Sequence, residues 1–222
     1  MHPRTPSSVA AALAWSDGYQ PPLTLEDYVR DGLLTRRQQL VLRQAISARL
    51  NILVGGGAET GKTTFVNALL AAVAENDDRV IVIEQLPELR CTSQSKLEIC
   101  VGPQVSAERA ITTAVRLRPD RLVIDDIQGD IARDVLNAWR DIPGGIGAVF
   151  GESAAHMLEV ITPSAGAHAL ASVTLEARNL VTRRIHLCVH LRQRRRRRSI
   201  SVERVVGCSS VHGFVLEARV AA

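Results

Sequence analysis

Short apolar runs alternate with longer amphipathic segments over most of the chain. The runs that we predict as buried strands span residues 51–54, 79–84, 97–101, 121–127 and 144–150. Segments with apolar residues three or four positions apart predict helices over 23–32, 35–48, 62–74, 107–117 and 131–140. Strands and helices that alternate at this spacing form βαβ units. We therefore predict an α/β fold with a largely parallel sheet flanked by helices.

The C-terminal third follows a different pattern. A predicted helix over 167–184 precedes three β-rich runs at 185–191, 200–206 and 214–220. Strands that follow one another through short turns predict a β-rich antiparallel appendage or an edge of the main sheet. These patterns divide the chain into a flexible leader (1–22), a helical linker segment (23–48), an α/β core (49–165) and a C-terminal helix with antiparallel strands (166–222).

Composition agrees with this fold. The chain is 46% hydrophobic but only 3% aromatic, so its core is mostly aliphatic. No run of 18 apolar residues occurs, so we expect no membrane span, and the first residues lack the pattern of a secretory signal. The four cysteines form no CxxC pair. We therefore expect reduced thiols in a cytosolic protein.

A phosphate-binding loop is the most specific motif in the sequence. Residues 56–63 match G-x-x-x-x-G-K-[ST] at every position, between an apolar strand and an amphipathic helix. Glycines let backbone N–H groups surround a phosphate, and the positive end of the helix dipole adds to the attraction. The predicted nucleotide-binding residues are Gly56, Gly57, Ala58, Glu59, Thr60, Gly61, Lys62, Thr63 and Thr64.

Three side chains of this loop have individual roles. We expect the Lys62 ammonium to reach the β- and γ-phosphates and the Thr63 hydroxyl to ligate Mg²⁺. Lys62 and Lys96 are the two lysines among 27 basic residues, and a lysine kept against such a preference for arginine indicates that its compact ammonium is needed. Glu59 is unusual here, because its carboxylate would repel phosphate unless it points to solvent.

Two predicted strands end in carboxylates that suit a bound nucleotide. One delivers Asp125 and Asp126 to its carboxyl end, where ligands bind in parallel sheets. We predict that Asp126 holds Mg²⁺ or polarises the attacking water, with Asp125 as the second metal ligand. Glu84 ends the preceding strand with Glu88 close behind, and both are predicted catalytic residues. The alternatives are helix capping by the aspartate pair and a solvated loop position for Glu84.

The order of these segments resembles the secretion ATPases of the type II/type IV superfamily, in particular the TrbB-type conjugal transfer ATPases. The matching stretches run from about Leu23 to the end: LTLEDYV and DGLLT before the core, NILV with the P-loop, LRPDR followed by Gly129, and Trp139 with PGGI. We expect the family's N-terminal domain, about 100 residues long, to be missing.

The resemblance implies a RecA-like P-loop NTPase core over 49–165 with ATP and Mg²⁺ as cofactors. It also implies a hexameric ring that meets secretion or conjugation channel proteins at the cytoplasmic face of the inner membrane. ATP hydrolysis would there power pilus assembly or substrate transfer.

Several positions depart from the family pattern. Phe150 stands where the family has a γ-phosphate-sensing histidine. Asp126 shortens the Walker B glutamate, Gln128 replaces an arginine, and the acidic segment that begins at Glu84 lacks two polar members. These changes fall on groups that complete hydrolysis, whereas the P-loop is intact. Because losing one aligned transition-state group costs roughly 10²–10³ in rate, we predict ATP binding with impaired hydrolysis.

Three interpretations stay open. The chain is a hydrolysing motor subunit, a non-hydrolysing regulatory paralogue in the same complex, or an unrelated P-loop NTPase. Against a kinase or GTPase, the sequence carries no lid segment rich in catalytic arginines and no Asn-Lys-x-Asp guanine signature.

The basic residues of the C-terminal third form one dense run. Arg192 and Arg194–Arg198 are nearly continuous, and without them the rest of the chain would be slightly acidic. Such a run suits contact with nucleic acid or an anionic membrane surface. The alternative is a solvated turn between two strands.

Overall fold

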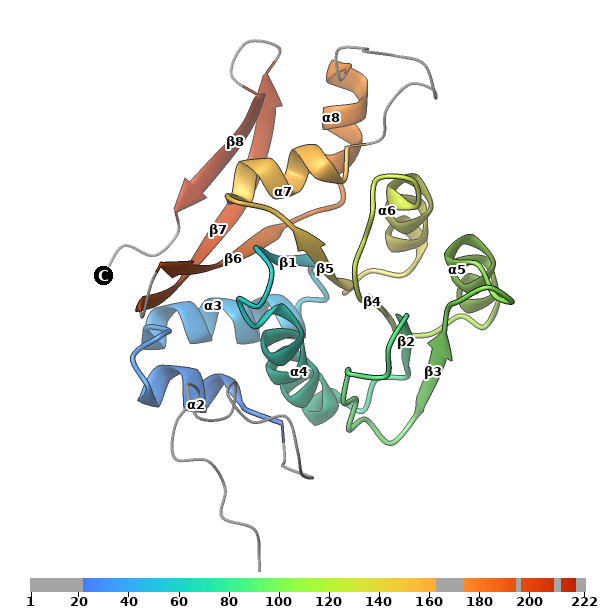
Figure 1. Ribbon diagram of the computed structural model, residues 1–222, viewed down its shortest axis with the longest axis horizontal. Coiled ribbons are helices and arrows are strands. Elements are labelled where there is room, and N and C mark those ends of the chain that lie inside the picture. The colour runs from blue at the N-terminus through green and yellow to red at the C-terminus, as the bar shows by residue number, and fades with distance from the viewer. Residues whose placement is uncertain (1–21, 163–173, 195–196, 210–212, 219–222) are drawn as a thin grey trace, which may run out of the picture.

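The computed structural model describes residues 22–162, 174–194, 197–209 and 213–218, and it confirms the α/β fold with a mostly parallel sheet flanked by helices (Figure 1). The strands are β1 (Ile52–Gly56), β2 (Val80–Glu84), β3 (Lys96–Cys100), β4 (Arg121–Ile124), β5 (Ile146–Phe150), β6 (Leu187–Arg194), β7 (Arg197–Ser209) and β8 (Gly213–Ala218). The helices are α2 (Leu25–Arg30), α3 (Arg36–Ser47), α4 (Lys62–Val73), α5 (Ala107–Arg116), α6 (Ala132–Asp141), α7 (Ala154–Val160) and α8 (Leu175–Thr182), with a 3₁₀ turn at Ala74–Asn76. The predicted leader falls almost wholly outside the described residues.

Within the described chain, all eight strands form one sheet in the order β3-β2-β4-β5-β1-β6-β7-β8. The pairings from β3 to β6 are parallel, and only β6–β7 and β7–β8 are antiparallel. The C-terminal strands therefore extend the main sheet, since β6 pairs in parallel with β1 instead of belonging to a separate antiparallel unit. Strand β1 lies between β5 and β6, and this order decides which side chains border the P-loop.

The core lies on both faces of the sheet. Strand side chains alternate between the faces, so Ile52 and Val54 pack with α2, α3 and α4, whereas Leu53 packs with the layer that contains α5, α6, α7 and α8. The α4 side chains of Phe65, Leu69, Leu70 and Val73 are fully buried. No helix in the part of the chain that the structure describes is long and apolar enough to cross a membrane.

Short polar signals fix where the helices begin. Thr24 and Asp27 form a reciprocal capping box at α2, and Thr35 with Gln38 does the same at α3. The sequence pattern did not predict α7, whose first turn is capped by the Ser153 hydroxyl.

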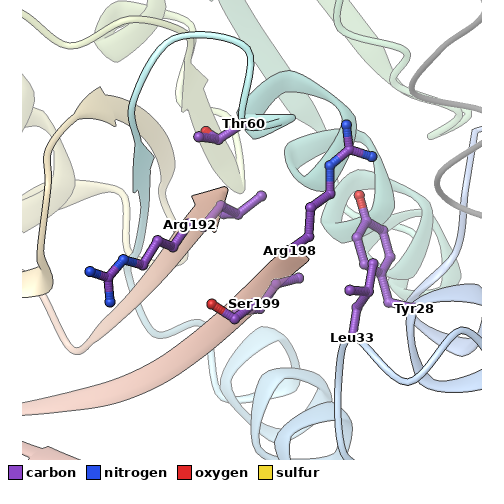
Figure 2. A pocket seen from close by; sticks show the side chains of 8 residues that line it. Tyr28, Leu33, Thr60, Arg192, Arg198 and Ser199 are labelled. Atoms are coloured by element: carbon purple, nitrogen blue, oxygen red, sulfur yellow. The ribbon is translucent and has the colours of Figure 1, made fainter. Parts of the chain in front are cut away.

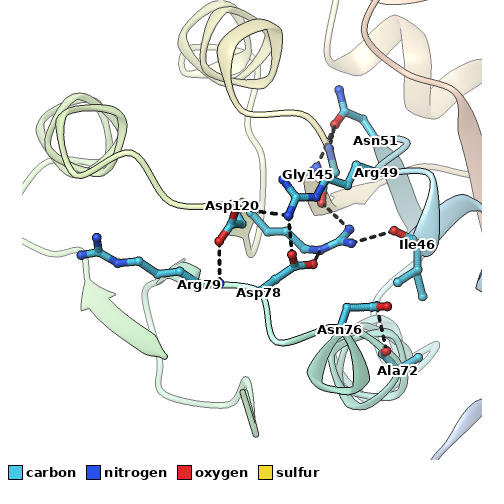
Figure 3. A network of polar contacts seen from close by, with 11 residues as sticks. Ile46, Arg49, Asn51, Ala72, Asn76, Asp78, Arg79, Asp120 and Gly145 are labelled. Carbon is cyan, nitrogen blue, oxygen red and sulfur yellow. Dashed lines mark hydrogen bonds and ion pairs between the residues drawn. The ribbon is translucent and has the colours of Figure 1, made fainter. Parts of the chain in front are cut away.

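A buried polar network holds the amino ends of the strands, opposite the P-loop edge (Figure 3). The Arg121 side chain is 1% exposed; its Nε donates to Asp78 at 2.6 Å, and a terminal nitrogen donates to the Ile46 carbonyl at 2.6 Å. The Asn51 side-chain oxygen accepts from the N–H groups of Gly144 and Gly145 at 2.9 and 2.8 Å. These bonds tie α3, β1, β4 and the entry to β5 together, and so fix the strands that carry the site.

Candidate nucleotide-binding site

The P-loop connects β1 to α4 and leaves the amino end of α4 open. Gly61 adopts a left-handed conformation (φ 91°) just before the helix, and no side chain caps α4. The first backbone N–H groups of a helix lack partners within it, so they are available to a phosphate. A Cβ at Gly56 would lie 2.5 Å from the Leu191 carbonyl oxygen, so only glycine fits where β1 meets the loop.

The Lys62 ammonium lies folded back over the loop. Its Nζ donates to the Gly57 carbonyl at 2.9 Å, and the Thr60 hydroxyl donates to the same oxygen at 3.0 Å. Thr63 and Thr64 follow on the first turn of α4 and are partly exposed. All the predicted P-loop residues thus lie at one end of α4, and the Lys62 ammonium is the cation among them.

Glu59 occupies a strained position at the loop's outer side. Its φ of 57° lies in the left-handed region, and its side chain is exposed. The carboxylate thus reaches solvent, and this is the orientation in which it does not repel a bound phosphate. Glycine adopts this backbone conformation without the steric cost that a side chain brings.

Glu59→Gly is expected to stabilise the chain by about 1 kcal/mol through relief of this strain. It should also raise the affinity for ATP several-fold, because one negative charge leaves the edge of the phosphate site. Urea unfolding and calorimetric ATP titration measure the two effects. Glu59→Gln is the matched control, because it removes the charge and keeps the strain, so it should improve ATP affinity alone. A loss of ATP affinity in both variants would contradict the expectation.

The acidic residues at the carboxyl ends of β2 and β4 form one electrostatic cluster. Burial, and then the neighbouring charges of Asp126, Glu88 and Glu84, raise the pKa of Asp125 to about 6. Asp126 is exposed, has a φ of 55°, and accepts from the Gln128 amide at 3.0 Å. The geometry therefore favours Asp125 over Asp126 as the carboxylate that faces the other acids.

Glu84 has a different environment from the one that the sequence suggested. It is 1% exposed, so the solvated-loop alternative is wrong. Its Oε2 accepts from the backbone N–H groups of Glu88 and Leu89 at 2.9 and 2.8 Å. Glu84 thus holds the turn after β2, and this turn carries the exposed Glu88. The capping alternative for the aspartates also fails, since no side chain caps α6 and the Ile131 N–H bonds to Asp130.

These residues fit a bound Mg²⁺–nucleotide. Among the described residues, no group of three or more His, Cys, Asp or Glu side chains could hold a metal alone. Mg²⁺ commonly takes one or two protein carboxylates and completes its shell with waters and phosphate oxygens. Thr63 and Asp125 are the ligands that this arrangement would use, and a divalent cation would relieve the repulsion that raises the pKa of Asp125.

Asp125→Asn is expected to stabilise the metal-free protein at pH 7.5 by about 1–2 kcal/mol, after allowance for solvent screening. A raised folded-state pKa means that the native state holds the proton more tightly than the unfolded state. Stability gained by protonation is therefore complete below about pH 4, where the unfolded side chain also protonates, and is lost as the pH rises through about 6. The gap between variant and parent should close as the pH falls from 6 to 4. Urea unfolding across this range, in EDTA, tests this; a gap that stays constant with pH would contradict it.

Phe150 lies beside the P-loop, where the sequence pattern placed it. It pairs in register with Gly56 and is 48% exposed. Its ring meets the His156 ring edge to face, with the centroids 6.2 Å apart. The His156 Nδ1 accepts from the Glu152 N–H at 3.2 Å, so this histidine is hydrogen-bonded to the backbone just before α7. The position next to the loop is therefore aromatic and apolar.

Four residues near the loop were not predicted as part of the nucleotide site. Strand β6 places His190 opposite Gly55, and burial lowers the pKa of this histidine. His190 and Arg192 line a hollow of about 480 Å³ with residues 57–60 and Glu152. Tyr28 and Arg198 line a second, narrow hollow with Thr60. The pairing of β6 with β1 brings His190 and Arg192 to the loop, and the pairing of β7 with β6 brings Arg198. Tyr28 reaches the loop from α2, through its contact with Phe65 of α4.

Comparison with known proteins places the chain in a family. Residues 19–221 match the family model described as type II/IV secretion system protein. The conjugal transfer protein TrbB of Rhizobium radiobacter is 31% identical over 183 residues, which are 76% of this chain and 57% of the relative. A probable TrbB of Sinorhizobium fredii is 32% identical over 165 residues, covering 72% and 51%. The chain thus spans about half the length of these curated relatives.

Solved structures share the fold. The VirB11 ATPase of the Brucella suis type IV secretion system, in complex with sulphate, superposes with a TM-score of 0.65 at 24% identity, over 84% of this chain and 64% of that one. The pilus retraction motor PilT with bound ADP gives a TM-score of 0.60 at 17% identity, over 78% and 51%. The RecA-like fold is therefore confirmed, and the chain belongs to the type II/IV secretion system protein family, with TrbB-type conjugal transfer proteins among its relatives.

Proposed function

We propose that the chain is an ATP-binding subunit of a conjugal transfer or type IV secretion motor, and that it hydrolyses ATP slowly. The observation that carries the proposal is the P-loop itself. Its helix end is uncapped, its lysine bonds to a loop carbonyl, and an acidic cluster lies at the same edge of the sheet, at the ends of β2 and β4. The family membership supplies the secretion and conjugation context.

In this proposal, different residues bind the phosphates, hold Mg²⁺ and orient water. The loop N–H groups and Lys62 hold the β- and γ-phosphates, and Lys62 exchanges its bond to the Gly57 carbonyl for a phosphate oxygen. Thr63 and Asp125 would hold Mg²⁺, which neutralises phosphate charge. Glu84 fixes the turn that presents Glu88, and Glu88 and Asp126 are the exposed carboxylates left to orient water.

Phe150 supports slow hydrolysis. A phenyl ring has no donor for the γ-phosphate, and its exposed face lies next to Gly56. The same observation favours a second function, that of a non-hydrolysing regulatory paralogue in a mixed ring. In either function we propose a hexameric ring at the cytoplasmic face of the inner membrane, in contact with the channel proteins.

ATP binding measured beside ATP hydrolysis tests the proposal. We expect saturable binding and a turnover far below about 1 s⁻¹, the lower end of the usual enzyme range. A restored variant with Phe150→His, Asp126→Glu and Gln128→Arg should hydrolyse ATP at least tenfold faster. Absence of saturable ATP binding would refute the function, and parent turnover at the ordinary enzyme range would refute impaired hydrolysis. No turnover in parent or restored variant, with binding intact, would favour the regulatory paralogue.

A further inference from the structure

The arginine run lies beside the P-loop and not on a remote surface. It occupies the ends of two paired strands, since β6 reaches Arg194 and β7 begins at Arg197; Arg195 and Arg196 lie outside the described residues. Strand β6 pairs with β1 so that Leu191 is opposite Gly56, the first residue of the P-loop. The strand ends that carry the arginines therefore continue past the sheet edge at which the P-loop begins.

A narrow slot joins this hairpin to the loop. Tyr28 and Leu33 form one wall, Thr60 borders it from the P-loop, and the rest of the lining comes from Leu191–Arg192 and Arg198–Ile200 (Figure 2). The Tyr28 ring packs edge to face on Phe65 of α4 at 5.0 Å. Figure 2 shows the Arg198 side chain running toward α4, with its guanidinium near the Tyr28 hydroxyl.

The Tyr28 hydroxyl lines this slot. Tyr28 is 1% exposed, and its hydroxyl has no hydrogen-bond partner among the described residues. Buried hydroxyl groups nearly always have a partner, and this one points into the slot. Burial raises the pKa of Tyr28, while the nearby Arg198 charge acts in the opposite direction, so a cation and a free hydroxyl face the same space.

The charges around the loop show what the slot is suited to take. Lys62 lies in the loop, whereas Glu59 and the Asp125 cluster place carboxylates around it. A nucleoside triphosphate brings several negative charges, so the site needs further cations. Of the two described arginines in the hollows that border the loop, Arg198 runs toward α4, whereas Arg192 points away from it (Figure 2).

The direction of α4 indicates which phosphate group the arginine contacts. Loop N–H groups before Lys62 hold the β- and γ-phosphates, and the residue after Thr63 faces the α-phosphate. Phe65, one position further, touches Tyr28 at the slot. We propose that Arg198 binds the α-phosphate of the nucleotide, a step that rests on the proposed ATP binding. A guanidinium matches phosphate oxygens in a bidentate manner, and the arginine hairpin thereby forms the nucleoside-side wall of the site.

Calorimetric titration with ATP and with tripolyphosphate tests this. Arg198→Gln should weaken the binding of both ligands about tenfold, because ATP and tripolyphosphate each present a third phosphate to this guanidinium. Arg204→Gln is the matched control, as Arg204 is an exposed arginine farther along β7, opposite Leu187; its affinities should stay within twofold. Arg198→Lys keeps the charge and should retain most of the affinity, which separates charge from folding effects.

The outcomes are distinct. Unchanged ATP affinity in Arg198→Gln overturns the proposal, as does a loss of affinity for ATP with none for tripolyphosphate, or an equal loss in Arg204→Gln. Loss of DNA or anionic-liposome binding with ATP affinity intact would assign the run to those surfaces instead. If the unmodified chain binds no ATP, the proposed function itself fails. Titration of the unmodified chain alone therefore distinguishes that failure from a failure of the Arg198 proposal.

Discussion

Lys62→Ala is expected to weaken ATP binding about 100-fold, since a charge-assisted hydrogen bond is worth about 1.5–3 kcal/mol and each 1.4 kcal/mol is a factor of ten. The lysine is the cation within the loop, and the helix end beside it has no side-chain cap. Its ammonium bonds only to the Gly57 carbonyl, so its removal should leave the fold intact. Calorimetric titration with Mg–ATP measures the loss.

Lys96→Ala is the matched control for that experiment. Lys96 is the other lysine of the chain and lies on the edge strand β3, where it pairs with Glu98 at 2.9 Å and is 43% exposed. Removal of this ammonium should leave ATP affinity unchanged within twofold. Equal affinity losses in the two variants would mean that net charge, and not the position of Lys62, controls binding.

The sequence was sufficient for the parts of the site that depend on local structure. The P-loop motif and the period of α4 predicted a helix that begins at Lys62, and the structure begins it there. The two acidic strand ends were also identified, because the carboxyl ends of parallel strands share an edge. These predictions use only neighbours along the chain.

Features that depend on distant pairing or on an unusual backbone were not predictable. Asp125 and Asp126 are adjacent, and the choice between them follows from a left-handed turn at Asp126 (φ 55°) that no glycine announces. The helix α7 follows β5 after a three-residue turn, and its apolar positions are too few to give a period. The nearness of Arg198 to the loop needs β6 to pair in parallel with β1, a contact between segments more than 130 residues apart.

The polar network at the opposite edge of the sheet shows the same dependence on distant partners. Its residues come from five separate segments. Apart from the place of Arg121 in a family motif, nothing in the sequence predicts that this arginine is buried and hydrogen-bonded. The structure buries this arginine against Asp78, which is itself 5% exposed. The positions of β1 and β4, and thus of the P-loop and Asp125, depend on that contact.

Arg121→Met is accordingly expected to destabilise the chain by about 3–5 kcal/mol, the usual cost of leaving one member of a buried ion pair uncompensated. Asp78 would keep a bond to Arg49 at 2.5 Å, but Arg49 is 42% exposed and cannot replace the donors that Arg121 supplies to Ile46 and Gly144. Urea unfolding at pH 7.5 measures the change.

Arg140→Met is the control, because Arg140 pairs with Asp141 on the surface, where both side chains are more than half exposed; it should leave the free energy of unfolding almost unchanged. A double variant, Arg121→Met with Asp78→Leu, should be more stable than Arg121→Met alone, since it removes the unpaired buried carboxylate. If the double variant is no more stable, the buried charge is not the source of the loss, and the backbone bonds to Ile46 and Gly144 carry the stability instead.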